Sequence, residues 1–177
     1  MGWESSKRQA DKYRPEIERI IRSIAGNIID VRESTPEEDQ FNATDYVVTV
    51  SDGNIACRVR EQYYWLKFGD FALRYSRPSG RITEFEKIKN GYGRWYLCAW
   101  TKRFSDNKLC AWVLVDLDRL RRSGLLDEPR SPILSPDNSG EFVVFSLLEL
   151  FQHNCITEAH NEVKARILRM LKRQQEH

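Results

Sequence analysis

Apolar residues near the N-terminus recur with the spacing of an α-helix. Isoleucines follow Pro15 at positions i, i+3, i+4 and i+7, and proline is tolerated in the first turn of a helix. These residues are Ile17, Ile20, Ile21 and Ile24. One face of the segment is therefore apolar, which predicts an amphipathic helix packed on another element.

The end of the chain shows the same helical period. Its apolar stripe consists of Val163, Ile167, Met170 and Leu171. Lysine and arginine occupy many of the positions between them, and Thr157 is the expected N-cap. The pattern predicts a C-terminal helix with a basic outer surface.

Between these two segments, short apolar and aromatic runs bounded by turn residues are typical of β-strands. The strongest signal is a hairpin over residues 44–60, in which Asp52-Gly53 is the expected two-residue type I′ turn. Further strands are expected at residues 28–31, 71–76, 94–100, 109–115 and 141–146. Irregular structure is expected at residues 61–70 and 127–140.

Short helices are marked by their caps. Thr83 and Glu86 have the spacing of a capping box, which starts a helix that stops at Asn90, and Asp116 caps another. The elements together predict an α+β (α/β-like) fold, a mixed central β-sheet on which an N-terminal, a mid-chain and a C-terminal helix pack. We expect residues 1–177 to form a single domain, because this length is sufficient for one core.

Charge and cysteine content narrow the function classes. The chain has 28 Lys+Arg and 26 Asp+Glu, so a surface for nucleic acid requires local segregation of charge. No apolar run approaches the length of a membrane span, and none of the four cysteines forms a CxxC pair. We therefore expect no membrane partner, no zinc ribbon, and a reducing, cytoplasmic location.

The hairpin concentrates charge on one face. With Asp52-Gly53 as its loop, Val47 is expected opposite Arg58, and Asp45 opposite Arg60. Alternate residues of a strand share a face, so these four side chains are expected on one patch of the sheet. Such a patch is either a functional site or a simple cross-strand ion pair between Asp45 and Arg60.

This order of elements resembles the PD-(D/E)XK nuclease superfamily, to which Holliday-junction resolvases and many restriction enzymes belong. The family has an Asp on one strand and (Asp/Glu)-x-Lys on the next, and here Thr44-Asp45 and Arg58-Val59-Arg60 occupy those places. The resemblance covers residues 10–100 and leaves residues 101–177 as additional strands and a C-terminal helix. The chain departs from the pattern at Arg58, which stands where the family has an acid.

The resemblance implies hydrolysis of a phosphodiester at a site where two carboxylates hold Mg²⁺ or Mn²⁺. Arg58 removes one ligand, so the second carboxylate must come from another element, with Glu84 or Glu86 on the capped helix the leading candidates. The expected catalytic residues are Asp45, Glu84 and Arg60, and the expected metal ligands are Asp45, Glu84 and Glu86. Asp70, Glu16 and Glu18 are further candidates for the missing acid.

If no carboxylate approaches Asp45, the same patch binds phosphate without cutting, since the arginine fork suits phosphate oxygens. The residues expected to contact nucleic acid are Arg58, Arg60, Arg74, Lys87, Lys89 and Arg94. Arg58, Arg60 and Arg74 are expected on adjacent strands, where the alternative to an anion-binding face is a solvated sheet face.

Several function classes stay open at this level. The first is a nucleic-acid-acting domain, either a metal-dependent endonuclease or its degenerate phosphate-binding relative. The second is a non-catalytic protein- or nucleic-acid-binding module of viral or mobile-element origin. The third is an interaction protein that forms a homodimer through its aromatic hairpin.

Overall fold

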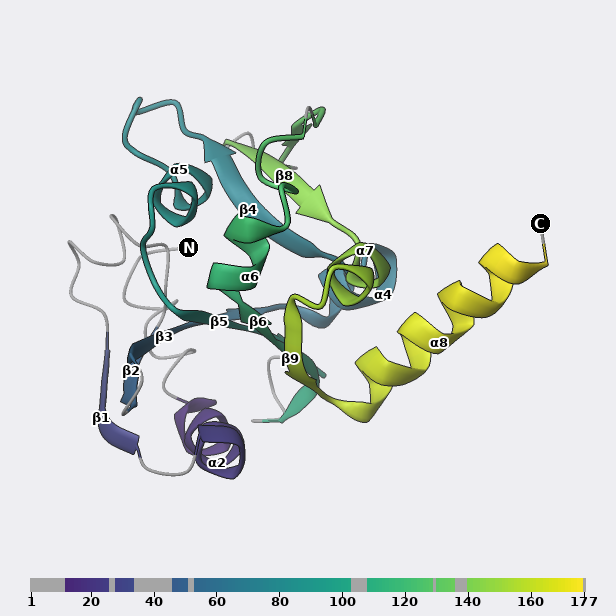
Figure 1. The fold of residues 1–177 in the computed structure, drawn as a ribbon. Helices are drawn as coiled ribbons and strands as arrows, with labels where there is room; N and C mark the ends of the chain where they lie inside the picture. The colour runs from purple at the N-terminus through teal and green to yellow at the C-terminus, as the bar shows by residue number, and fades with distance from the viewer. Residues whose placement is uncertain are drawn as a thin grey trace.

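The computed structural model describes residues 12–25, 28–33, 46–50, 53–102, 108–128, 130–135 and 140–176. Their strands form one large and one small sheet (Figure 1). The large sheet has the order β1 (Ile28–Glu33), β2 (Tyr46–Val50), β3 (Gly53–Arg60), β5 (Trp95–Thr101), β6 (Leu109–Asp116) and β9 (Ile156–Ala159). The small sheet has the order β4 (Phe71–Ser76), β8 (Glu141–Phe145) and β7 (Ile133–Leu134). The predicted α+β class with a mixed sheet is confirmed.

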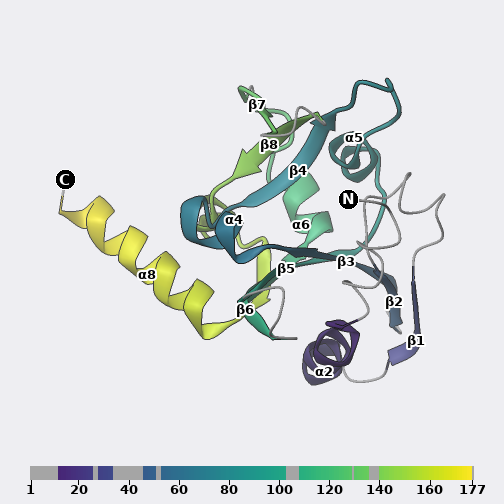
Figure 2. The same cartoon turned by 180° about the vertical axis from the view of Figure 1, so that it is seen from behind.

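Helices cover the large sheet unequally. Those described are α2 (Arg14–Ala25), α4 (Gln62–Lys67), α5 (Glu84–Lys89), α6 (Leu117–Arg122), α7 (Leu147–Gln152) and α8 (Asn161–Gln175). Helix α2 lies alone on one side, while the small sheet and most of the other helices lie on the opposite side (Figure 1). Both views show the far end of α8 extending away from the rest of the chain (Figure 2).

The large sheet separates two apolar clusters, because neighbouring residues of a strand point to opposite faces. Leu97 and Ala99 of β5 belong to the cluster covered by α2, together with Ile20. Tyr96 and Trp100 of the same strand belong to the larger cluster, on the side of the small sheet. The predicted isoleucine stripe therefore buries one face of the sheet, and the small sheet buries the other.

Strand β4 lies outside the large sheet, which corrects the expectation of one central sheet. Strand β3 pairs in parallel with β5, and the connection between them contains α4, β4 and α5. Parallel neighbours need a long crossover, so the segment is free to place β4 elsewhere. It pairs with the distant β8, with Phe71 level with Phe145. Arg74 is therefore not on a strand adjacent to Arg58 and Arg60.

The hairpin exists, but its predicted register is wrong by two residues. Val47 pairs with Ala56 rather than Arg58, and Val50 pairs with Gly53. Gly53 pairs with Val50 at the end of the ladder instead of lying in the loop, and it does so with a φ of 133°, which few other residues adopt. A shift of two preserves the face on which Arg58 lies. Asp45 and Asp52 lie outside the described residues. The expected pairing of Asp45 with Arg60 therefore also lies outside them.

Three local expectations are wrong because tertiary contacts override local signals. Residues 62–67, expected to be irregular, form α4, whose Trp65 packs on Trp100 with ring centroids 5.1 Å apart. Thr157 lies in β9 instead of capping α8, whose N-cap is His160. The predicted loop at 127–140 contains the short strand β7. Among the described helices, none combines the length and apolar character needed to cross a membrane.

Candidate anion-binding site

The two arginines of β3 lie on the same face of the large sheet as the larger apolar cluster. Arg58 is level with Cys98 of β5, and Arg60 is level with Trp100. Both side chains are partly buried and extend toward the small sheet. The Nη2 of Arg60 donates a hydrogen bond to the carbonyl oxygen of Ala72 in β4, at 2.8 Å. The hairpin therefore supplies cations to the space between the two sheets.

Side chains from other elements form hydrogen bonds with backbone groups at the open edge of β4. This strand has β8 as its one neighbour in the small sheet, so its other edge presents unpaired backbone groups. The carbonyl of Ala72 accepts from Arg60, and the N–H of Arg74 donates to Glu84 Oε2 at 3.0 Å. Residues two apart present their backbone groups to the same edge. Arg60 and Glu84 thus bridge the small sheet to β3 and α5.

Glu84 is the buried carboxylate of the site. It is 3% exposed and follows Thr83, the N-cap of α5. Its Oε1 accepts a hydrogen bond from the Tyr96 hydroxyl at 2.5 Å, and its Oε2 lies 3.4 Å from Nη1 of Arg58. The capping box between Thr83 and Glu86 fixes the start of the helix. Both oxygens of Glu84 therefore have partners within the protein.

Several cations surround Arg74. Its pKa is lowered to about 10, first by burial and then by the charges of Arg58, Arg77 and Arg60, whereas the charge of Glu84 raises it. Burial, followed by the charge of Arg77, also lowers the pKa of Lys87. We call Arg58, Arg60, Arg74 and Arg77 the arginine cluster.

An aromatic ring holds two members of the arginine cluster together. The guanidinium carbons of Arg60 and Arg74 lie 5.5 and 5.2 Å from the centroid of the Phe142 ring, at cation–π distance. The Nε atoms of both arginines are buried and have no hydrogen-bond partner within the described part of the chain. Buried donors without acceptors are unfavourable, so the two Nε atoms lower the stability that the ring contacts provide.

A divalent metal is poorly supported by the carboxylates that the structure describes. Glu84 already accepts from Tyr96 and Arg74, and Glu86 accepts from Thr83 within the capping box. No group of three or more His, Cys, Asp or Glu residues suitable for a metal occurs in the described ranges. The expected ligand Asp45 lies outside these ranges. Of the three expected catalytic residues, the structure therefore describes Glu84 and Arg60.

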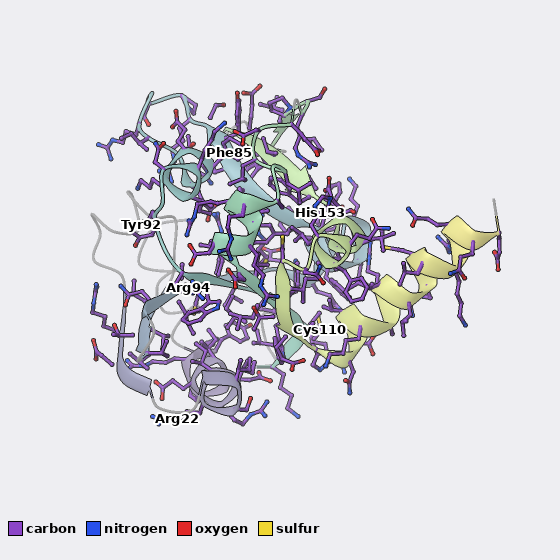
Figure 3. The ribbon with its side chains drawn as sticks, viewed as in Figure 1. Arg22, Phe85, Tyr92, Arg94, Cys110 and His153 are labelled. Carbon is purple, nitrogen blue, oxygen red and sulfur yellow. The ribbon has the colours of Figure 1, made fainter. Side chains whose placement is uncertain are left out.

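The remaining sequence candidates lie elsewhere. Lys89 pairs with Asp127 at 2.7 Å, and Arg94 pairs with Asp118 while lying over the Trp95 ring. Figure 3 shows Phe85, a residue of α5, and Arg94, which lies at the level of the large sheet and away from that helix. These two cations are engaged outside the arginine cluster.

The other candidates for the missing acid also lie away from the arginine cluster. Glu16 accepts from the Leu109 N–H on the α2 side of the sheet, and Glu18 pairs with Arg14. Asp70 precedes β4, and its pKa is raised to about 6 because the effect of burial exceeds the opposing charge of Arg166. None of these three carboxylates has a described contact with Glu84.

Three contributors to the site escape sequence reasoning. Arg77 follows β4 without any local pattern, and Tyr96 reads as an ordinary core residue of β5. Phe142 comes from β8, and it reaches the site because it is level with Arg74 in the small sheet. Only the pairing of β4 with β8, which local sequence does not signal, brings it there.

Comparison with known proteins adds no relative. No family model matches the chain, and neither curated proteins nor solved structures give a match. The site therefore has to be interpreted from its own geometry.

Proposed function

We propose that this protein binds nucleic acid through the arginine cluster and does not cleave it. One observation carries the proposal: Arg58, Arg60 and Arg77 lie close enough to Arg74 to lower its pKa, and the buried carboxylate Glu84 beside it pairs with Arg58 at 3.4 Å. Phosphate is the anion that matches such a group, since each guanidinium can donate two parallel hydrogen bonds to its oxygens. Phosphate contacts position a protein on nucleic acid and need no base recognition.

The small number of carboxylates with free oxygens near Arg58, among the described residues, favours binding over cleavage. The resemblance to PD-(D/E)XK nucleases calls for two acids around a metal, and Arg58 replaces one of them. Glu84, which pairs with Arg58, has both oxygens engaged by the protein. A cation such as Arg58 at a metal ligand's place also repels the metal.

A reducing, cytoplasmic setting belongs to the same proposal. All four cysteines are free thiols, and Cys57, Cys98 and Cys155 are buried. Unpaired buried cysteines are typical of proteins that stay in a reducing compartment.

The test is the salt dependence of binding to DNA and RNA oligonucleotides, measured by fluorescence anisotropy. We expect the logarithm of the affinity to fall linearly with the logarithm of salt concentration, because phosphate contacts release counterions. The variant Arg60→Gln/Arg74→Gln should lower the magnitude of that slope by about 1 to 2. The matched control is Arg19→Gln/Arg22→Gln on α2, across the large sheet, which should leave the slope unchanged.

Incubation with Mg²⁺ or Mn²⁺ separates binding from cleavage. We expect the oligonucleotides to stay intact with both wild type and Asp45→Ala. Metal-dependent cleavage by the wild type that Asp45→Ala abolishes would overturn the non-catalytic proposal in favour of a nuclease. Absence of any binding at low salt would overturn the assignment to nucleic acid.

A further inference from the structure

We infer that α4 and the adjoining face of α8 bind a single strand of nucleic acid, whose bases stack on exposed rings of α4 and whose phosphates contact cations of α8. The inference rests on the proposed function for the class of its ligand, and it assigns a second surface built from other residues than the arginine cluster. It follows from three observations: the rings gathered on α4, the cation among them, and the contact of α8 with the same helix.

Three aromatic rings gather at α4. The ring centroids of Tyr63 and Tyr64 lie 5.5 Å apart, and the Phe68 ring lies 6.4 Å from each of them. Tyr63 is 50% exposed and Phe68 is 38% exposed, whereas Trp65 of the same helix is buried. Figure 2 shows α4 with no described helix or strand in front of it. Such rings offer open π-faces, on which bases of any sequence can stack.

A lysine lies among these rings. Its ammonium, Lys67 Nζ, is 5.3 Å from the centroid of the Tyr63 ring and 5.1 Å from that of the Phe68 ring. It also donates a hydrogen bond to the Tyr63 hydroxyl at 2.8 Å. Burying the rings in a membrane or against an apolar protein surface would desolvate this charge, which is unfavourable. A nucleic-acid strand fits better, because it brings a phosphate to the cation and a base to the rings.

Arg166 holds α8 beside the same rings. Its guanidinium donates hydrogen bonds to the carbonyl oxygens of Trp65 and Phe68, at 3.1 and 2.6 Å. It also lies 5.1 Å from the centroid of the Trp65 ring. A side chain at Gly69 would collide with this guanidinium, so the contact depends on the glycine. Arg166 is therefore a positioning residue that fixes α8 relative to α4.

The rest of α8 beyond Arg166 is basic. Three exposed cations, Arg169, Lys172 and Arg173, occur there with one acid, Glu176. Residues three or four apart share a helix face, so Arg169 and Arg173 continue the face on which Arg166 meets α4. Both views show this end of α8 extending away from the rest of the chain (Figures 1 and 2). A strand stacked on the α4 rings can therefore place its phosphates along this row of guanidiniums.

The experiment measures anisotropy of three dye-labelled 12-mers: a single strand of mixed sequence, the same strand with its bases replaced by abasic sites, and the duplex of that sequence. We expect the wild type to bind the intact single strand about tenfold tighter than the abasic strand, because stacked bases add to the phosphate contacts. The duplex has its bases paired and stacked internally, so its affinity should not depend on the α4 rings.

Variants of α4 test the stacking. Tyr63→Ala should remove most of the preference for the intact strand and leave the affinities for the abasic strand and the duplex unchanged. Tyr63→Phe loses the hydroxyl but keeps the ring, so it should retain the preference. The matched control is Phe151→Ala on α7, which removes a ring of similar exposure, 48%, and should also retain it. Thermal melts confirm that each variant is folded.

A variant of α8 tests the phosphate contacts. Arg169→Gln/Arg173→Gln should weaken binding of the intact and abasic strands by the same factor, because it removes contacts that both strands share. It should also lower the magnitude of the salt slope by about 1. An unchanged slope with unchanged affinity would overturn the part assigned to α8.

The outcomes distinguish this inference from the proposed function. Equal affinity of the wild type for intact and abasic strands, with binding still weakened by Arg60→Gln/Arg74→Gln, overturns the inference and leaves the proposed function intact. A preference for the intact strand that Tyr63→Ala does not reduce overturns it as well. No binding of any oligonucleotide at low salt overturns the proposed function. Sedimentation with phosphatidylserine–phosphatidylcholine vesicles that Tyr63→Ala abolishes, without any change in strand affinity, would assign the rings to a membrane surface and overturn the inference.

Discussion

Glu84 stabilises the arginine cluster inside the fold. It is the acid that favours the charge of Arg74, and it joins α5 to β4 and to Tyr96. The burial of Tyr96, followed by the charge of Glu84, raises the pKa of this tyrosine well above its usual range, so its hydroxyl stays a donor. One side chain therefore balances part of the cluster's charge and also satisfies the β4 edge.

Removing Glu84 should strongly destabilise the protein. Glu84→Ala leaves Arg58 near other cations without its acid, and breaking a buried charge pair costs about 3 to 5 kcal/mol. Glu84→Gln keeps acceptor and donor groups in place, so we expect a smaller loss of about 1 to 2 kcal/mol. Urea denaturation measures both.

The control for Glu84 is Glu158→Ala. Its ion pair with Lys164 is solvent-exposed, so this change should cost about 1 kcal/mol or less. Equal free energies of unfolding for Glu84→Ala and Glu158→Ala would show that Glu84 has no structural part in the site.

Asp70 should make stability depend on pH. Its pKa is raised by burial from an ordinary 3.8 to about 6 in the folded protein. Between these pH values the folded state binds more protons than the unfolded state. The free energy of unfolding should therefore fall as pH rises from about 4 to 6. Asp70→Asn should reduce this decline, measured as urea midpoints at pH 4 to 7. The exposed Asp30→Asn should leave it in place.

Residue-level reasoning from the sequence succeeded where a local pattern determines the contact. The Thr83–Glu86 box is present, and Arg58 and Arg60 share a face as expected. It failed for the partner of Val47, because Gly53 adopts its unusual backbone conformation inside the ladder. Arg74 meets the others across two sheets, a contact that strand alternation does not encode.

At the scale of elements, boundaries were predictable where pairing and caps are local. The strand at residues 71–76 and the helix ending at Asn90 match the structure. Helix α4 was missed because it buries Trp65 alone, which leaves no helical period to detect. Strand β9 was missed because its pairing with β6 is a long-range contact.

The capping box of α5 should contribute measurably to stability. Thr83 is 3% exposed, its hydroxyl accepts from the Glu86 N–H, and the Glu86 carboxylate accepts from the Thr83 N–H. Thr83→Ala removes the hydrogen bond from the Glu86 N–H to the Thr83 hydroxyl. The free energy of unfolding, measured by urea denaturation, should fall by about 1 to 2 kcal/mol. The nearby exposed Ser79→Ala is the control and should change the free energy of unfolding by less than about 0.5 kcal/mol.

For the whole molecule, the central question is whether the two apolar clusters unfold together. Both are built on the same strands, with Leu97 facing one cluster and Tyr96 the other. The antiparallel pair β5–β6 also joins the segment at residues 10–100 to the residues that follow it. A sheet shared in this way transmits the loss of one cluster to the other.

We therefore expect one cooperative unfolding transition, as the single-domain prediction requires. Ile20→Ala on the α2 side and Leu73→Ala on the small-sheet side remove fully buried side chains, and each should cost about 2 to 5 kcal/mol. Far-UV circular dichroism and tryptophan fluorescence should give the same urea midpoint in each variant. If Ile20→Ala instead produced an early transition in one probe while Leu73→Ala did not, the α2 face would unfold on its own. The arginine cluster would then belong to a separately stable unit formed by the small sheet, α5 and the adjoining face of the large sheet.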